Sequence, residues 1–424
     1  MDRVINLGVP HVGEHIFGYL DTPHLLKYRF VSKVWKKLSE NVLVKGWRTH
    51  PFCACSNGQT DIVQLLLEHH NGRIIDWNAK DQKYQGTALH HACYFGQTDI
   101  VQLLLKYSVA KNIDWDSKDK NGNVPFHLAS HQGHKDIVQL LMNHSTEKAI
   151  QLNTKGISGF TPAMLACIKG KTEVVQSMLE HPNSKSIDWN ARDEVNQSTA
   201  LHHACAYHQT DIVNLLLDYS DGQNIDLNAR TTSGSTALHY ACYHGDPDVV
   251  KVLLEHPMGN KIDFNAVAEN ENTVLHIASE LGHTDIVKAL LDHSENRSIE
   301  LDARDVNGAT PLNTACYYGM TDVVKLLLTH SMGQTIDFNS KDDNGHSPFQ
   351  VACINGHNEV VKLLLDHSEE KGIDLNSEDS NGLTALMNAL QYGRSNVVIL
   401  IVDHKIKIVR EKLDSKKPAY ESPI

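Results

Sequence analysis

One feature constrains the fold of this chain more than any other: a segment of nearly fixed length recurs from residue 49 almost to the C-terminus. Thr236–Leu254 is a representative copy, and we take the first residue of its Thr-Ala-Leu-His as an anchor. Seven of the nine intervals between anchors are 37 residues and two are 38, and the anchors are Thr49, Thr87, Val124, Thr161, Thr199, Thr236, Thr273, Thr310, Ser347 and Thr384. A period of this size predicts a solenoid, in which each unit buries its apolar face only against its neighbours.

Each unit is predicted to contain two short helices. Leu238 and Ala241 are three residues apart and so share one face of a first helix. Gly245 follows as a helix breaker, and the apolar residues of 249–254 supply the buried stripe of a second helix. An Ile-Asp-X-Asn segment and a polar turn then lead to the next anchor, so the pattern predicts an all-α fold.

This pattern resembles the ankyrin repeat, whose signature is a β-turn plus two helices with Thr-Pro-Leu-His-x-Ala. The resemblance covers residues 49–404 and implies ten helix-turn-helix units with β-turn connections. The usual unit has about 33 residues, and here about four extra residues follow the Leu-Leu-Leu of the second helix. Because four residues make about one helical turn, we expect either a longer second helix or a larger loop in every repeat but the last.

Residues 1–48 do not follow the repeat. Their apolar residues are spaced by three or four, which predicts short amphipathic helices. The segment resembles an F-box, because Val9-Pro10, Ile16-Phe17-Gly18-Tyr19-Leu20, Leu25-Leu26 and Val31-Ser32-Lys33-Val34-Trp35 match that family's pattern in order. Pro10 lies one residue closer to the Ile-Phe pair than the family pattern has it.

The F-box resemblance implies a function. F-box proteins are adaptors that dock on the Skp-type subunit of a cullin ubiquitin ligase and capture a substrate with the rest of the chain. The residues that it assigns to adaptor binding are Pro10, Ile16, Phe17, Leu20, Leu25, Val31, Val34 and Trp35. The alternative is a non-ubiquitin ankyrin scaffold, in which residues 1–48 only cap the apolar end of the solenoid.

The ankyrin resemblance also places partners at the turn tips and at the exposed ends of the first helices, on the concave side. Those helix ends lie seven and eight residues after each anchor and are rich in aromatic side chains: Tyr94, Phe95, Tyr207, Tyr243, Tyr317, Tyr318 and Tyr392. Tyrosine supplies a large rigid contact and a hydroxyl, and it is enriched at recognition surfaces. We therefore predict that these residues bind the substrate protein, while the competing interpretation is that they pack on the next repeat.

Charge differs along the chain. Residues 1–48 carry 8 Lys/Arg against 4 Asp/Glu, residues 49–404 carry 25 against 44, and residues 405–424 carry 6 against 3. The acidic repeats argue against nucleic-acid binding and favour a basic partner, although acidity also serves to keep a long solenoid soluble. The basic residues 405–424 have two interpretations, a nuclear signal or a solvated capping tail that is partly disordered, and we favour the tail.

No membrane span or signal peptide is predicted, because no apolar run approaches the required length. We expect a cytoplasmic protein, with the nucleus as a second location. Seven of the eight cysteines lie six residues after an anchor, where Ser130 and Ser279 also occur, so this position requires a small side chain. We interpret them as reduced core thiols.

The tryptophans and histidines receive structural interpretations too. Trp77, Trp115 and Trp189 occupy a position that also takes Leu and Phe, which indicates a core role. Most of the 27 histidines recur either three residues after the anchor or at the end of the second helix. The resemblance implies hydrogen bonds between repeats for the first set, and the helix dipole accounts for the second. We expect no enzyme activity, no metal and no cofactor.

Overall fold

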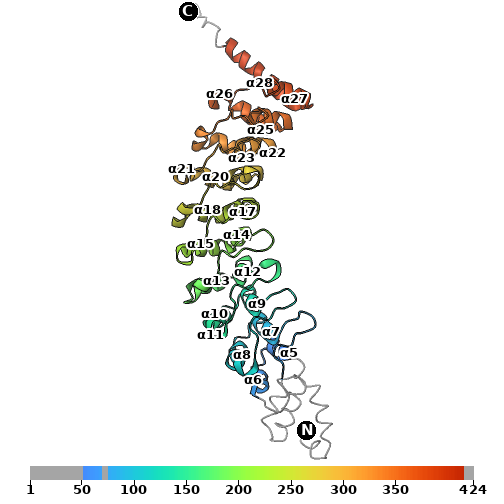
Figure 1. Ribbon diagram of the computed structural model, residues 1–424. Helices are drawn as coiled ribbons and strands as arrows, with labels where there is room; N and C mark the ends of the chain where they lie inside the picture. Colours follow the sequence, from blue (N-terminus) through green and yellow to red (C-terminus); the bar gives the residue numbers. More distant parts are fainter. Residues whose placement is uncertain (1–50, 69–74, 415–424) are drawn as a thin grey trace, which may run out of the picture. The chain divides into compact units, whose positions relative to one another are not determined.

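The computed structural model describes residues 51–68 and 75–414, all of it in helices, turns and loops (Figure 1). Within these residues only an isolated bridge, between Glu378 and Thr384, has β character. The chain divides into two compact units, Met1–Val195 and Asn196–Ile424, which we call unit 1 and unit 2 and describe separately.

Each repeat contributes a first and a second helix, and the two sets form two layers within each unit (Figure 1). In unit 1 the first helices are α5 (Pro51–Ser56), α7 (Ala88–Tyr94), α9 (Pro125–Gln132) and α12 (Pro162–Ile168). The second helices of unit 1 are α6 (Thr60–Glu68), α8 (Thr98–Lys111), α10 (Lys135–Asn143) and α13 (Thr172–Glu180). Neighbouring helices of the same layer pack on one another, for example α5 on α7 and α7 on α9.

Unit 2 repeats this arrangement. Its first helices are α14 (Ala200–Ala206), α17 (Ala237–His244), α19 (Val274–Glu280), α22 (Pro311–Tyr318), α24 (Pro348–Asn355) and α27 (Ala385–Gln391). Its second helices are α15 (Thr210–Asp218), α18 (Pro247–Glu255), α20 (Thr284–Asp292), α23 (Thr321–Thr329), α25 (Asn358–Asp366) and α28 (Ser395–Asp414). Helix α28 continues ten residues past 404, where we expected the repeats to end. The tail that we predicted to be disordered, 415–424, lies outside the described residues.

The core is made by positions that recur in every repeat. Cys242 and its equivalents are fully buried, and so are Ser130 and Ser279 in the same position. The eight cysteines are present as thiols, and burial raises the pKa of Cys55 and of Cys167 to about 12. Trp77, Trp115 and Trp189 are also buried. The structural interpretation of the cysteines and tryptophans is therefore confirmed.

The histidines of the first set connect successive repeats. In repeat 6, His239 accepts the backbone N–H of Thr236 on Nδ1 at 3.2 Å, and its Nε2 lies 3.3 Å from the carbonyl oxygen of Asn272, directly before the anchor of repeat 7. Because Nδ1 is an acceptor, Nε2 carries the proton and donates to that carbonyl. His90, His127, His202 and His276 make the same bond. Asn313 and Gln350 replace histidine in repeats 8 and 9, and their side-chain amide groups donate the equivalent hydrogen bonds to the carbonyls of His346 and Leu383.

The four-residue insertion takes different forms in different repeats. In repeat 2 it lengthens α8 to 14 residues, as one of our two alternatives predicted. Repeats 3, 5, 7 and 9 instead form a separate helical turn, α11 (Ser145–Lys148), α16 (Ser220–Gln223), α21 (Ser294–Arg297) and α26 (Ser368–Lys371). Repeats 4, 6 and 8 form a 3₁₀ turn, η2 (Ser184–Ser186), η3 (Pro257–Lys261) and η5 (Ser331–Thr335). In these seven repeats the second helix keeps nine residues and the extra residues enlarge the connection after it, as our other alternative predicted. We did not predict that the connection would fold into a helical or 3₁₀ turn.

The helix dipole alone does not explain the second histidine set, because the hydrogen bonds of these histidines depend on which kind of turn follows the second helix. His181, His256 and His330 precede the 3₁₀ turns, and each accepts a backbone N–H two residues on through Nδ1. Their Nε2 atoms bond to Asn143, Asp218 and Asp292 of the preceding repeat at 2.8–3.0 Å. His404, in contrast, lies inside α28. These specific bonds, more than the dipole, fix the position of the first three rings.

Candidate protein-binding surface

The predicted aromatic residues lie at the C-terminal ends of the first helices, which we call the helix-one ends. There the chain leaves the helix through a left-handed residue, usually glycine such as Gly245 and Gly319, so the last side chains of the helix project away from the core. The aromatic side chains are between 45 % and 62 % exposed, with Tyr243 the most exposed of Tyr94, Phe95, Tyr207, Tyr243, Tyr317, Tyr318 and Tyr392. They are therefore accessible to a partner.

Within unit 2 three of these rings contact a neighbouring ring of the same helix end. The rings of Tyr317 and Tyr318 meet edge to face with centroids 5.0 Å apart, and Tyr243 contacts His244 in the same way at 5.3 Å. His244 also lies 6.3 Å from the ring of His208 in the preceding repeat. The structure thus brings repeats 5 and 6 together at this surface. In unit 1, Tyr94 and Phe95 form a similar edge-to-face pair at 5.0 Å.

Sequence reasoning missed several polar members of this surface. The Nδ1 atom of His208 lies 2.9 Å from Oδ2 of Asp246 in the next repeat. His208 has a φ of 59°, a conformation that glycine provides at the same position of the nine other repeats. A histidine there is strained, and such strain is often retained at functional sites. The replacement of a recurring glycine is the sequence signal that could have identified it.

Acidic side chains border the aromatic rings. Burial raises the pKa of Tyr318, and a hydrogen bond to the carboxylate of Glu280 raises it further. Together with Asp246, Glu280 gives this part of unit 2 an acidic character beside its apolar rings. Such a surface suits a partner with basic and aromatic or aliphatic side chains.

The turn tips add exposed apolar residues that we did not single out from the sequence. Ile157 and Val306 are 49 % and 52 % exposed. Tyr84, at another tip, is 45 % exposed, and the ammonium of Lys120 lies 4.4 Å from its ring centroid. Successive tips are connected by backbone bonds, for example from the N–H of Val306 to the carbonyl of Asn270. The tips are therefore ordered and accessible.

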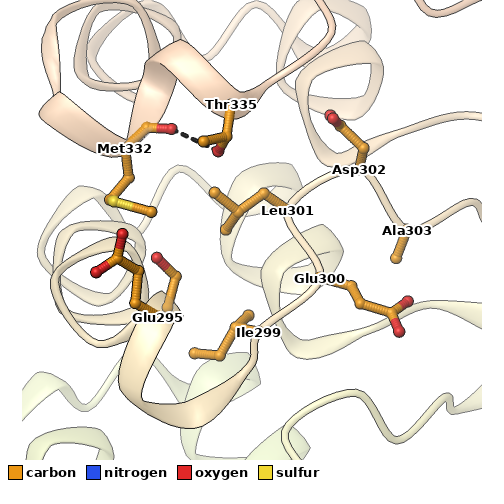
Figure 2. Close-up of a pocket in the computed structure, with 9 residues that line it drawn as sticks. Glu295, Ile299, Glu300, Leu301, Asp302, Ala303, Met332 and Thr335 are labelled. Carbon is orange, nitrogen blue, oxygen red and sulfur yellow. Dashed lines mark hydrogen bonds between the residues drawn. The ribbon is translucent and has the colours of Figure 1, made fainter.

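A hollow of about 500 Å³ lies elsewhere, between the insertions of repeats 7 and 8, and none of the predicted residues lines it. Figure 2 shows that the side chains of Glu295 and Glu300 in its wall point to opposite sides, so it does not bring these carboxylates together. Among the residues that the structure describes, no group of three or more His, Cys, Asp or Glu is placed to hold a metal ion.

Asp302, in the wall of this hollow, departs from the repeat. At its position Asn228 accepts the N–H of Asp263 at 2.8 Å and donates to the carbonyl of Lys261 at 2.7 Å. Asp302 accepts the corresponding N–H, of Asp337, at 3.0 Å, but its other oxygen is buried and has no hydrogen-bond partner in the described part of the chain. Burial raises the pKa of Asp302. The wall of the hollow is therefore a weak point of the repeat stacking.

Comparison with known families decides what the repeats are. The family model described as ankyrin repeats (3 copies) matches five overlapping stretches, 33–114, 106–193, 185–268, 258–342 and 332–412. This chain is an ankyrin-repeat protein. No curated protein matches it. The ankyrin-repeat match begins inside the N-terminal segment and includes Val34 and Trp35.

No F-box is detected in this ankyrin-repeat protein. The predicted adaptor-binding residues, Pro10, Ile16, Phe17, Leu20, Leu25, Val31, Val34 and Trp35, lie outside the described residues, so their arrangement stays a prediction. None of the described helices is both long enough and apolar enough to span a bilayer.

Proposed function

We propose that this ankyrin-repeat protein captures a partner protein through its helix-one ends. The observation that carries the proposal is the set of exposed aromatic rings at the helix-one ends of repeats 2, 5, 6, 8 and 10. Aromatic side chains placed on a rigid scaffold lose little conformational entropy when they are covered, and they dominate the energetics of many interfaces. Since equivalent helix ends carry these rings in four repeats of unit 2, two of them adjacent, an extended segment of a partner could contact several of them.

The partner is basic under this proposal. The repeats carry 25 Lys/Arg against 44 Asp/Glu over residues 49–404, and Asp246 and Glu280 contact members of the aromatic surface. Complementary charge accelerates encounter and excludes acidic competitors. Raising the salt concentration should therefore slow association more than it speeds dissociation.

We further propose that the captured protein is a substrate for ubiquitin transfer. The support is the F-box-like sequence of residues 1–48, with Ile16-Phe17 and Trp35 as its principal apolar residues. In this arrangement the N-terminal segment docks on the Skp-type adaptor and the repeats hold the substrate. The second candidate, a scaffold that only tethers partners, retains the aromatic surface and dispenses with the adaptor.

Titration calorimetry of the full-length protein against a purified Skp-type adaptor separates these two functions. The ligase function predicts saturable binding that an Ile16→Asp/Phe17→Asp variant loses. The matched control is Val306→Asp, which places an acidic residue on an exposed turn tip and should bind normally. If correctly folded wild-type protein does not bind the adaptor, the ligase function is contradicted and the tethering function is the one that agrees with the result.

A further inference from the structure

Helix α28 carries an exposed apolar stripe. Ile399, Val402, Ile406 and Val409 are 56 %, 39 %, 43 % and 55 % exposed. On the opposite face Val397 and Ile401 are each only 1 % exposed, and the helix packs on α25. The helix therefore has two apolar faces, and among the described residues only one of them is covered.

The repeat pattern does not require this stripe. At the position of Ile399 the nine other repeats carry polar residues, namely Gln64, Gln102, Gln139, Gln176, Asn214, Lys251, Lys288, Lys325 and Lys362. Val402 occupies a position that is buried in inner repeats, as Leu254 and Leu328 show. Ile406 and Val409 belong to the extension that gives α28 its 20 residues, against nine in α25. The stripe is thus particular to this helix.

The spacing of the stripe identifies what covers it. Residues 399, 402, 406 and 409 are separated by three, four and three positions, which is the spacing of the a and d positions of a coiled coil. All four side chains are β-branched, and such side chains are stiff and pack well in a helix seam. At 20 residues the helix is about 30 Å long. A second helix of similar length is therefore the fitting occupant.

We propose that α28 pairs antiparallel with α28 of a second copy of this chain, forming a two-fold symmetric dimer. In this register Ile399 of one copy faces Val409 of the other, and Val402 faces Ile406. Symmetry repeats both contacts, so four apolar layers cover the whole stripe. A two-fold axis uses the same patch on both copies, which is the commonest form of homo-oligomer.

The charges beside the stripe select this orientation. In the antiparallel register Asp403 of each copy lies beside Arg410 of the other, which gives two attractive pairs, while the two Lys405 side chains meet near the axis. In a parallel pair Lys405 would face Arg410 twice, with no attractive pair in compensation. Asp403, Lys405 and Arg410 are exposed in the monomer, so their charges are available.

Sedimentation equilibrium of the full chain tests the pairing, because it measures the molecular mass in solution. Protein concentrations between about 1 and 100 μM cover the range in which a dimer with a micromolar dissociation constant forms. We expect a dimer, and we expect Ile399→Lys/Ile406→Lys to be a folded monomer. Val306→Lys, a matched change at an exposed apolar residue of unit 2, should remain dimeric. A monomeric wild type overturns the proposal, and so does a dimer that survives the double change.

A charge exchange tests the orientation and the register. Asp403→Arg and Arg410→Asp should each weaken the dimer at least tenfold, because each change places like charges together in both pairs. Mixed in equal amounts, the two variants should form a heterodimer, and the chain carrying both changes should dimerise with itself. If mixing restores nothing, α28 does not pair in this way. Deletion of 415–424 should leave the dimer intact, whereas a chain that dimerises only after deletion contradicts the proposal.

Discussion

The Nε2 atom of His330 lies 2.8 Å from Oδ1 of Asp292, which ends the second helix of the preceding repeat. The same ring accepts the N–H of Met332 through Nδ1, so one side chain both starts the 3₁₀ turn of its own repeat and contacts the helix end of the preceding repeat. In unit 1, His181 makes the equivalent bond to Asn143 at 2.9 Å. The contact therefore does not depend on a carboxylate.

Replacing Asp292 tests how much this bond contributes. Asp292→Ala should lower the free energy of unfolding by about 0.5–1 kcal/mol, because the bond lies at a partly exposed site. Asp292→Asn should keep most of the stability, since Asn143 performs the same role. Urea midpoints of the two variants provide the comparison, and equal losses would show that the hydrogen bond is not the source.

His239 makes the protein sensitive to acid. Burial lowers its pKa to about 4, whereas the unfolded chain titrates near 6.5. The unfolded state therefore binds more protons between these values, and stability that is present above about pH 6.5 is lost as the pH falls toward about 4. His127, whose pKa burial also lowers to about 4, adds to the effect.

A glutamine should remove this sensitivity without breaking the contact. Gln350 already accepts the N–H of Ser347 and donates to the carbonyl of Leu383, both at 3.0 Å. We expect His239→Gln to match the wild type within about 1 kcal/mol at neutral pH and to lose less stability in acid. Urea midpoints at about pH 7 and about pH 5 measure this. A variant that loses as much as wild type between the two would assign the acid response to other groups.

Replacing Asp302 by asparagine, the residue that other repeats use at this position, should stabilise the protein. Asp302→Asn supplies the missing donor toward the next repeat and should raise the free energy of unfolding by about 1 kcal/mol at neutral pH. The raised pKa of Asp302 gives the sign of its pH dependence: its contribution is present at low pH and is lost as the pH rises through the folded-state pKa. The gain from asparagine should therefore shrink in acid. Asn228→Asp is the reciprocal control and should destabilise.

Ser279 is a buried hydroxyl in a position that cysteine usually occupies. Its oxygen has no hydrogen-bond partner within the described residues, and the side chain is fully buried. Ser279→Cys should stabilise the protein by about 1 kcal/mol, because burying an unpaired hydroxyl is costly while a thiol behaves as a small apolar group. Cys242→Ser should lose a similar amount. Thermal unfolding of both variants tests the pair, and a stabilised Cys242→Ser would contradict this explanation.

The sequence was sufficient for the parts of the fold that repeat. The spacing of Leu238, Ala241 and the 249–254 stripe predicted both helices, and the common position of the cysteines predicted their burial. The exposed aromatic positions followed from the period as well. Each of these features depends on which residues face a neighbour, and a period of 37 residues determines that directly.

Other features depend on contacts that a single repeat does not reveal. Whether an insertion forms a helical or a 3₁₀ turn is not decided by one residue: Pro257 and Ser331 both begin 3₁₀ turns, whereas Ser294 begins a helical one. The two 3₁₀ turns are coupled to the helix end of the preceding repeat through His256 and His330. Similarly, His208 joins the aromatic surface because of Asp246 in the next repeat.

The most direct test of the account is to map the contact with a captured partner. Full-length protein with a photo-crosslinking residue at Tyr243 or at Tyr317 should crosslink to the same basic protein. The variant Tyr243→Ser/Tyr317→Ser, without a crosslinker, should no longer bind that protein. A crosslinker at Val109, which is 83 % exposed on α8 in the second-helix layer, is the control and should not capture it. Capture from Val109 but not from the tyrosines would contradict the proposal that the helix-one ends form the binding surface.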